Sequence, residues 1–321
     1  MTQIKVYTMG RVLVDLYANQ SGVPLDKTDM FHKYVGGSAA NTAIGLGRLG
    51  INVGLISRVG NDIFGKYIKD RLTSEGVDIK LLRTDPDYPT ALVFAAPFPP
   101  NDSEVLHYGY PNAHSQINVE DVKFDPLESE RILVVAATSL STPSSREATL
   151  WALKENRNHG GCNVIDVDWR PVFWQKETDA QKYYDAALEF TDVVLANEPE
   201  LEFAGRSTDP EQAANRILSL GVSEVVAKRG GKGCFHFTRE NICKVDPYPV
   251  SVVNTLGAGD GFGAAYVYAL LQKWPVEHRI SFASAAGAIV VSRHSCSEAM
   301  PSLEEIEALI HTNRIVGTFT N

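Results

Sequence analysis

A glycine-rich turn that ends in an acid is the part of the sequence best suited to chemistry. It has the motif N-T-L-G-A-G-D at 254–260 and precedes an apolar segment with helical composition. Gly257, Ala258 and Gly259 have almost no side chain, so their backbone N–H groups can close on an anion at a helix start. A carboxylate at Asp260 could accept the proton of a hydroxyl while a phosphate is transferred to it. The alternative is a turn kept small for packing, with Asp260 only a charge in the first helical turn.

A second glycine pair lies near the N-terminus, in the motif Y-V-G-G-S-A-A-N-T-A at 34–43. Gly36 and Gly37 stand at the expected start of a helix, where glycine lets a ligand approach the backbone. Asn41, one turn further on, offers both a donor and an acceptor to the hydroxyl groups of a polyol. The alternative is close packing of this helix against another through its small side chains.

Both motifs need a scaffold, and the chain predicts an α/β domain for it. Apolar, β-branched runs alternate with segments of helical composition, which is the pattern of parallel strands joined by crossover helices. The expected strands are 4–9, 132–136, 162–167, 193–196, 224–228 and 250–253, and the expected helices include 63–75, 180–190, 212–220 and a segment around 148.

Two stretches, at about 11–35 and 81–112, break this alternation. They contain short strand-like pieces, prolines and aromatic residues without a good helix between them. We expect them to form a small β-sheet that stands off the main domain as a lid and excludes water from a site. The alternative is a pair of long surface loops. The whole chain, 1–321, is then one domain with a lid.

The composition excludes several classes of protein. The net charge is −9 and the pI is about 5.4, which argues against nucleic acid as a partner. No run approaches the about 18 apolar residues of a membrane-spanning helix, and no signal-peptide pattern opens the sequence. The four cysteines are scattered, so we expect reduced thiols in a cytoplasmic enzyme.

Taken together, the two glycine motifs resemble the two signatures of the ribokinase-like (PfkB) carbohydrate kinases, in the same order and at a matching separation. The resemblance covers nearly the whole chain, from 6 to about 312. It implies a three-layer α/β/α domain with a central, mostly parallel sheet and a small β-sheet lid. It also implies transfer of phosphate from ATP to a sugar hydroxyl, with Asp260 as base. Gly257, Ala258 and Gly259 would form the anion hole and contact ATP.

The same resemblance suggests where substrate hydroxyl groups bind. The segment 10–15 looks like the family's first-strand motif, whose terminal carboxylate holds the sugar. Asp15 would then be a substrate ligand together with Gly36, Gly37 and Asn41. An exposed acid at the end of a strand is the alternative for Asp15.

Two further motifs resemble the family's nucleotide and magnesium elements. The motif N-E-P-E at 197–200 is similar to its N-x-x-E element, which implies that Glu200 holds Mg²⁺ through water and that Asn197 lies near ATP. A helix cap is the alternative, and the two roles can coexist. The motif K-R-G-G-K-G at 228–233 is similar to the nucleotide-binding turn, and a plain hairpin turn is its alternative. The residues implied to contact ATP there are Lys228, Gly230, Gly231 and Gly233.

One position departs from the family pattern. Many members have Asp where this chain has Asn254, and that Asp often helps to bind a monovalent cation. A requirement for K⁺ is therefore left open, although backbone carbonyls around Thr255 and Leu256 remain available. The proposed base is unaffected.

The motif D-V-D-W-R-P-V-F-W at 166–174 bears on the substrate. Arg170 presents a planar fork suited to a carboxylate, and flanking rings would fix its orientation, which favours a sugar acid. The alternative is an ordinary ion pair with Asp168. The motif resembles the corresponding region of family members that phosphorylate keto-deoxy sugar acids. The segments 9–12, 15–17, 98–100, 254–256 and 292–296 look most like those of members acting on 5-dehydro-2-deoxygluconate in inositol breakdown. A 2-dehydro-3-deoxygluconate kinase, or a fructokinase or ribokinase type, is the alternative.

Other readings of the chain are less well supported. A nucleotide-dependent oxidoreductase would suit the architecture, but the first strand is followed by G-R-V-L-V-D rather than G-x-G-x-x-G. A relative that binds ligand without catalysis is opposed by the retained Asp260. The family implies a homodimer formed through the lid, which the apolar content of the lid segments allows. His107, Tyr108, Tyr110 and His294 receive no role.

Overall fold

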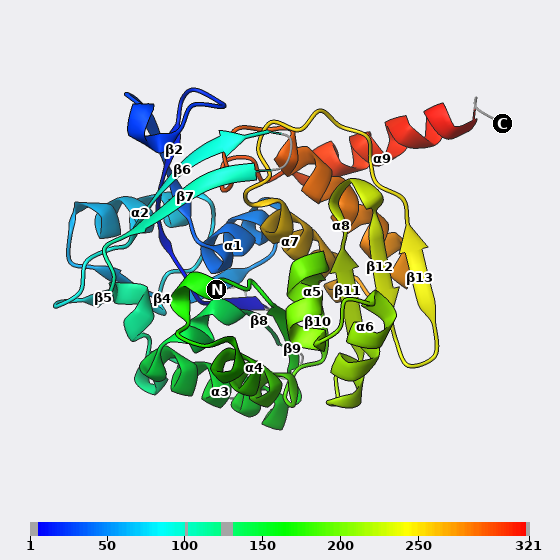
Figure 1. Cartoon of the computed structure of the whole chain (residues 1–321), viewed down its shortest axis with the longest axis horizontal. Helices are drawn as coiled ribbons and strands as arrows, with labels where there is room; N and C mark the ends of the chain where they lie inside the picture. The colour runs from blue at the N-terminus through cyan, green and yellow to red at the C-terminus, as the bar shows by residue number, and fades with distance from the viewer. Residues whose placement is uncertain (1–5, 100–101, 123–130, 319–321) are drawn as a thin grey trace.

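A nine-stranded sheet forms the centre of the fold (Figure 1). The computed structural model describes residues 6–99, 102–122 and 131–318. The strand order is β13-β12-β11-β10-β9-β8-β1-β4-β5, and all neighbours are parallel except at the β11-β12-β13 end. The strands are β1 (Val6–Met9), β4 (Val53–Gly60), β5 (Leu82–Asp85), β8 (Ile132–Ala136), β9 (Cys162–Asp166), β10 (Val193–Asn197), β11 (Glu224–Lys228), β12 (Cys234–Phe237) and β13 (Ile242–Val245).

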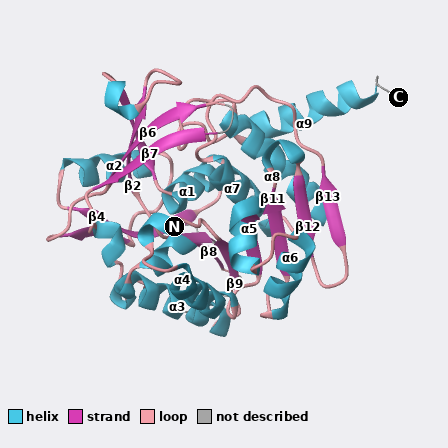
Figure 2. Cartoon of the chain, in the orientation of Figure 1, coloured by secondary structure: helices cyan, strands magenta, loops and turns pink. Residues whose placement is uncertain are grey.

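Helices cover both faces of this sheet, so its inner strands are buried on both sides (Figure 2). One face packs against α1 (Ser38–Arg48), α2 (Ile63–Ser74), α7 (Ala258–Leu271), α8 (Val276–Val291) and α9 (Leu303–Thr318). The other packs against α3 (Pro143–Asn158), α4 (Glu177–Leu188), α5 (Glu198–Gly205) and α6 (Pro210–Ser219). The predicted three-layer α/β/α architecture is confirmed. Within the described ranges, no helix is long and apolar enough to cross a membrane.

A second sheet of four strands lies beside the helices α1 and α2 (Figure 1). Its order is β3-β2-β6-β7, with β2 and β6 parallel and the outer pairs antiparallel. The strands are β2 (Leu13–Ala18), β3 (Phe31–Gly36), β6 (Leu92–Phe98) and β7 (Asp102–Tyr108). The small β-sheet expected beside the main domain is therefore present.

Three expected segments differ from the observed elements. The stretch 81–112 was expected to belong wholly to the small sheet, but β5 pairs with β4 at the edge of the main sheet. The expected strand 250–253 is a loop, since Val253 donates its N–H to the carbonyl of Val291 at the end of α8 rather than to a neighbouring strand. The first strand is observed from Val6, and residues 4–5 lie outside the described part.

Candidate active site

The glycine turn at 254–260 starts α7. Gly257 has φ of 83°, a left-handed conformation, and a Cβ there would lie 2.6 Å from the Cβ of Cys296. Glycine is therefore required by both backbone conformation and space. Asp260 follows in the first turn of the helix, as the sequence predicts. The amides of this turn and the acid thus share one helix N-terminus, where negative charge is favoured.

Asp260 is held by two side chains from the first turn of α1. Ser38 Oγ donates to one carboxylate oxygen at 2.7 Å, and Asn41 Nδ2 donates to the other at 2.8 Å. Oδ1 of Asn41 is buried and has no partner among the described residues. Burial raises the pKa of Asp260 to about 7, opposed by the donor from Asn41 and assisted by the charges of Asp166 and Asp168. The two glycine motifs therefore meet at one carboxylate.

The glycines before α1 are required by neighbouring groups. A Cβ on Gly36 would lie 2.1 Å from a carboxylate oxygen of Asp15, and one on Gly37 would lie 2.5 Å from the carbonyl oxygen of Arg11. Asp15 is on β2 and also accepts from Cys296 Sγ at 3.0 Å. Burial raises the pKa of Asp15 to about 6, although the hydrogen bond from Cys296 and the charge of Arg11 oppose the shift. Asp15 is therefore buried, so the alternative of an exposed acid at the end of a strand is wrong.

The carboxyl ends of β9, β10 and β11 bring further polar residues to the same edge of the sheet. Nζ of Lys228 pairs with Asp166 at 2.9 Å, and a Cβ on Gly259 would lie 3.2 Å from that ammonium group. Lys228 therefore lies beside the start of α7. In an open α/β sheet, ligands bind outside the carboxyl ends of the strands.

Asn197 and Glu200 form a capping box at the start of α5. The Asn197 side chain accepts from the N–H of Glu200 at 2.9 Å, and the Glu200 side chain accepts from the N–H of Asn197 at 2.8 Å. Burial raises the pKa of Glu200 to about 7, against the charge of Lys228. The helix-cap interpretation is confirmed. Oε1 of Glu200 takes no part in the cap and remains available for other contacts. It forms an ion pair of 3.9 Å with Nη1 of Arg170.

The turn at 228–233 joins the antiparallel strands β11 and β12, so it is also a hairpin. Gly230 and Gly233 have φ of 53° and 84°. A Cβ on Gly233 would lie 2.1 Å from the carbonyl oxygen of Val245, whereas Cβ atoms on Gly230 and Gly231 would meet open space. The backbone at Gly230 and Gly231, close to Lys228 in the chain, is therefore open to a ligand.

Asn254 has a structural role in the loop before α7. Its Nδ2 donates to the carbonyl of His294 at 3.0 Å, and its Oδ1 accepts from the N–H of Leu256 at 3.0 Å. The side chain is almost wholly buried. It therefore fixes the loop that leads into the glycine turn.

Arg170 takes part in a charge cluster that the sequence indicated only in part. Its Nη2 lies 2.9 Å from Asp168 Oδ1, so the ion pair considered as an alternative is present. Asp168 is buried and also accepts from Arg11 at 2.8 Å and from Thr138 at 2.9 Å. Three residues of the site, Arg11, Thr138 and Ser38, were not predicted from the sequence. Arg11 and Thr138 are each the second residue after a strand, and Ser38 follows the glycine pair before α1. A polar residue in these places is the signal that could have indicated them.

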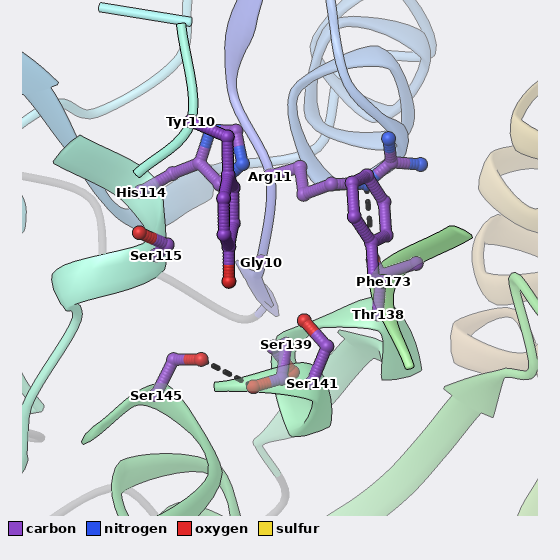
Figure 3. Close-up of a pocket in the computed structure, with 10 residues that line it drawn as sticks. All are labelled: Gly10, Arg11, Tyr110, His114, Ser115, Thr138, Ser139, Ser141, Ser145 and Phe173. Atoms are coloured by element: carbon purple, nitrogen blue, oxygen red, sulfur yellow. Dashed lines mark hydrogen bonds between the residues drawn. The ribbon is translucent and has the colours of Figure 1, made fainter. Parts of the chain in front are cut away.

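Aromatic side chains border this cluster. Phe173 contacts the ring of His107 on β7 at 5.0 Å between centroids and stacks with Tyr110 at 6.3 Å. A pocket beneath them is lined by residues that include Arg11, Tyr110, His114 and Phe173 (Figure 3). His107 and Tyr110, given no role from sequence, thus connect the small sheet and the loop after it to the charge cluster.

The chain is similar to known proteins along nearly its whole length. It is 36% identical over 312 residues to the 5-dehydro-2-deoxygluconokinase of Geobacillus kaustophilus (strain HTA426), covering 95% of this chain and 93% of that protein. A protein of the same name from Clostridium tetani (strain Massachusetts / E88) is 33% identical, covering 96% of this chain and 93% of its own length.

Solved structures share the fold. The fructokinase of Vibrio cholerae O395 with fructose, ADP and calcium bound has a TM-score of 0.87 at 25% identity, covering 95% of this chain and 98% of that one. A provisionally named Ribokinase II from E. coli with ATP and Mg²⁺ bound has a TM-score of 0.88 at 29% identity, covering 97% and 100%. Residues 3–303 match the family described as pfkB family carbohydrate kinase. Given this match and these relatives, the chain belongs to the pfkB family of carbohydrate kinases, which are phosphotransferases.

Proposed function

We propose that this protein transfers the terminal phosphate of ATP to a hydroxyl of 5-dehydro-2-deoxygluconate, a keto-deoxy sugar acid. The observation that carries the reaction is the position of Asp260, held by Ser38 and Asn41 beside the N-terminal amides of α7. The name shared by relatives over nearly the whole chain supports the substrate.

The geometry of Asp260 suggests how the transfer occurs. The substrate hydroxyl gives its proton to Asp260 as its oxygen bonds to phosphorus, and the bond from phosphorus to the departing ADP oxygen breaks. The pKa of about 7 makes this acid a base near neutral pH. The amides at Gly257, Ala258 and Gly259, with the nearby Lys228 ammonium group, would stabilise charge on the transferring oxygens.

We assign the polar residues around Asp260 to the sugar acid. The unpartnered Oδ1 of Asn41 is a buried acceptor that a substrate hydroxyl would satisfy. Asp15 would accept from further hydroxyls, while Gly36 and Gly37 allow the ligand to approach the backbone. Arg170 would meet the carboxylate, because its pairing with Asp168 leaves part of its fork for another acceptor.

The nucleotide is assigned to the hairpin and the adjoining strand ends. The open space beside Gly230 and Gly231 and the tight turn at Gly233 support this, with Asn197 and Lys228 next to the phosphates. The described residues contain no group of three or more His, Cys, Asp or Glu placed to hold a metal. This fits Mg²⁺, which is usually held by one or two carboxylates, water and phosphates. Glu200 would hold it through water, and bound Mg²⁺ would offset phosphate charge.

A requirement for K⁺ is a separate proposal. Both polar atoms of the Asn254 side chain are used within the loop, so backbone carbonyls near Thr255 and Leu256 would have to bind the cation. Comparing rates in potassium with those in sodium at equal ionic strength tests it. Equal rates would contradict a requirement for K⁺.

A screen of phosphate acceptors tests the proposed reaction and substrate together. ATP consumption is measured with 5-dehydro-2-deoxygluconate, 2-dehydro-3-deoxygluconate, fructose and ribose, each with Mg²⁺ present. The highest kcat/KM is expected with the first of these. A higher kcat/KM with 2-dehydro-3-deoxygluconate or a neutral sugar would show that the proposed substrate is wrong. No transfer to any sugar would contradict the proposed function.

Replacing Asp260 tests the base. Asp260→Asn keeps the size of the side chain but cannot take a proton, so kcat should fall by about 10²- to 10⁴-fold. The affinity for ATP should change little, because only the proton acceptor is removed. Steady-state kinetics and nucleotide titration measure the two effects, and unchanged turnover would refute the assignment.

A further inference from the structure

Arg11 is an unusually well-fixed cation within the candidate site. It follows Gly10 at the carboxyl end of β1, and its residue is only 8% exposed. Its Nε donates to Thr138 Oγ1 at 3.0 Å, its Nη2 donates to Asp168 at 2.8 Å, and its guanidinium carbon lies 5.7 Å from the centre of the Phe173 ring. Two hydrogen bonds and a ring contact therefore hold this guanidinium in one orientation before any ligand binds.

Asp168 is paired with two arginines at once. This single buried carboxylate is shared by two guanidinium groups, with Arg11 on one oxygen and Arg170 on the other. Among the described carboxylates, only Asp168 pairs with Arg11, whereas Arg170 also forms a long ion pair of 3.9 Å with Glu200. The Arg11 side chain is 10% exposed and has only a share of one carboxylate, whereas the Arg170 side chain is 42% exposed. A buried guanidinium that shares its counter-charge can gain from a further anion.

The neighbouring histidines, His107 and His114, add no positive charge to the two arginines near neutral pH. Burial and the charges of Arg11 and Arg170 lower the pKa of His107 to about 4. Burial and Arg11 lower the pKa of His114 to about 3, and its Nδ1 lies 3.0 Å from the carbonyl of Val12. Both rings are therefore neutral, and the positive charge of this cluster lies on the two arginines.

Arg11 also lies next to the residues assigned to the sugar. Its carbonyl oxygen would lie 2.5 Å from a Cβ on Gly37, and its charge acts on Asp15. Its side chain lines the pocket below Tyr110 and Phe173 (Figure 3). Nη1 of Arg11 has no hydrogen-bond acceptor within the described ranges, so N–H groups are left for a ligand.

We propose that Arg11 is a second ligand of the substrate carboxylate, and that it selects acids over neutral sugars together with Arg170. This inference rests on the proposed function, because it requires an acidic substrate. A carboxylate placed between the two guanidinium groups would give Arg11 a counter-charge besides that of Asp168, which it shares with Arg170. It would also satisfy the donors that Asp168 and Thr138 leave free.

A four-way comparison tests whether Arg11 touches the carboxylate. The wild-type protein and Arg11→Gln are each assayed with 5-dehydro-2-deoxygluconate and with its C1 carboxamide, which has the same shape but no charge. The wild-type protein should favour the acid by about 10- to 100-fold in kcat/KM, the range expected for charged hydrogen bonds. Arg11→Gln should lose most of that preference through a higher KM for the acid, with kcat changed far less. Equal loss toward acid and amide would overturn the inference, because it indicates a structural role.

Two further variants keep the comparison interpretable. Arg58 bridges Asp85 and Asp121 at 2.8 and 2.6 Å, so Arg58→Gln breaks a similar shared ion pair outside the site. It should leave the preference for the acid unchanged. Arg11→Lys keeps the charge but not the fork, and should retain part of the preference. It provides the same comparison if Arg11→Gln does not fold: a larger rise in KM for the acid than for the amide would support the inference, and equal rises would overturn it.

The outcomes also separate this inference from the proposed function. If the wild-type protein phosphorylates no sugar acid, the proposed function fails. If it phosphorylates the acid and Arg11→Gln keeps the full preference over the amide, only the role of Arg11 fails.

Discussion

Asp260 shows how burial and two hydrogen bonds set the working range of one acid. Its removal from water raises its pKa, and donors from Asn41 and Ser38 limit the rise, so that the pKa is about 7. A carboxylic acid with the usual pKa near 4 would be a much weaker base. The residue is therefore suited to taking a proton near neutral pH.

This balance predicts the pH dependence of the free enzyme. The base must be ionised to accept a proton, so kcat/KM should rise with pH through about 7. Ser38→Ala removes a donor that favours the ionised form, so it should move this limb upward by about half a pH unit or more. A pH–rate profile of each protein measures the shift.

A control separates this effect from other groups that titrate in the same range. The pKa of Glu200 is also raised to about 7, but Ser38 does not contact it. Ser144 donates to the carbonyl of Ile117 and lies outside the site, so Ser144→Ala should keep the wild-type profile. A limb that stays in place in Ser38→Ala would exclude Asp260 as the titrating base.

Four elements are tied together at Glu224, the first residue of β11. Its carboxylate accepts from His236 on β12 at 2.9 Å, from Tyr266 on α7 at 2.5 Å and from Arg279 on α8 at 3.0 Å. Although burial opposes it, these partners hold the pKa of Glu224 at about 2. Because Asp260 lies on α7, this network helps to anchor the helix that carries the proposed base.

The network predicts a stability effect without a catalytic one. Glu224→Ala would leave Arg279, which is 6% exposed, without its counter-charge, and should lower the free energy of unfolding by about 3–5 kcal/mol. KM should hardly change, since Glu224 and the site residue Lys228 are at opposite ends of β11. Urea denaturation and steady-state kinetics measure the two quantities.

The same network has a pH signature and a matched control. Because the pKa of Glu224 is lowered, its contribution is full above the ordinary value of 4.5 and is lost as pH falls toward about 2. Tyr266→Phe removes two hydrogen bonds, one to Glu224 and one from Arg279, but leaves the ion pair, so it should cost only about 1–2 kcal/mol. A similar loss of stability in the two variants would argue against the ion pair as the main contribution.

The small sheet ends in an edge strand with exposed apolar side chains. On β7, Val105, Leu106 and Tyr108 are 40%, 52% and 64% exposed. An uncovered edge strand and apolar side chains together favour association. We therefore propose that two copies of the chain dimerise through this sheet, and that the sheet also acts as the lid over the site.

This association can be tested by sedimentation. The wild-type protein should sediment as a dimer, and Leu106→Glu should shift it toward the monomer because the charge would be buried in the contact. Ile63 is 79% exposed at the start of α2, so Ile63→Glu should leave the dimer intact. If the wild-type protein sediments as a monomer, the proposed dimer is wrong.

Much of the architecture follows from local patterns in the chain. Short β-branched runs alternate with helical segments, and this periodicity is enough to predict the layers, the strands β8 and β11 and the helix α2. The glycine turn likewise predicts the helix start that places Asp260, because its requirement for small residues is local. For positions such as Asp15 and Glu200, the local pattern allowed both a structural and a functional interpretation. Similarity to a family then suggested which functional role each of them has.

The contacts that complete the site depend on packing between distant segments. Ser38 and Asp260 are 222 residues apart, and Arg11 and Asp168 are 157 residues apart, so their pairing follows from which strand ends and helix starts become neighbours. The same holds for 250–253, an apolar run whose backbone bonds to the end of α8 instead of a strand. Local composition sets what a segment can form, whereas the partner of each buried polar group is decided when the layers pack.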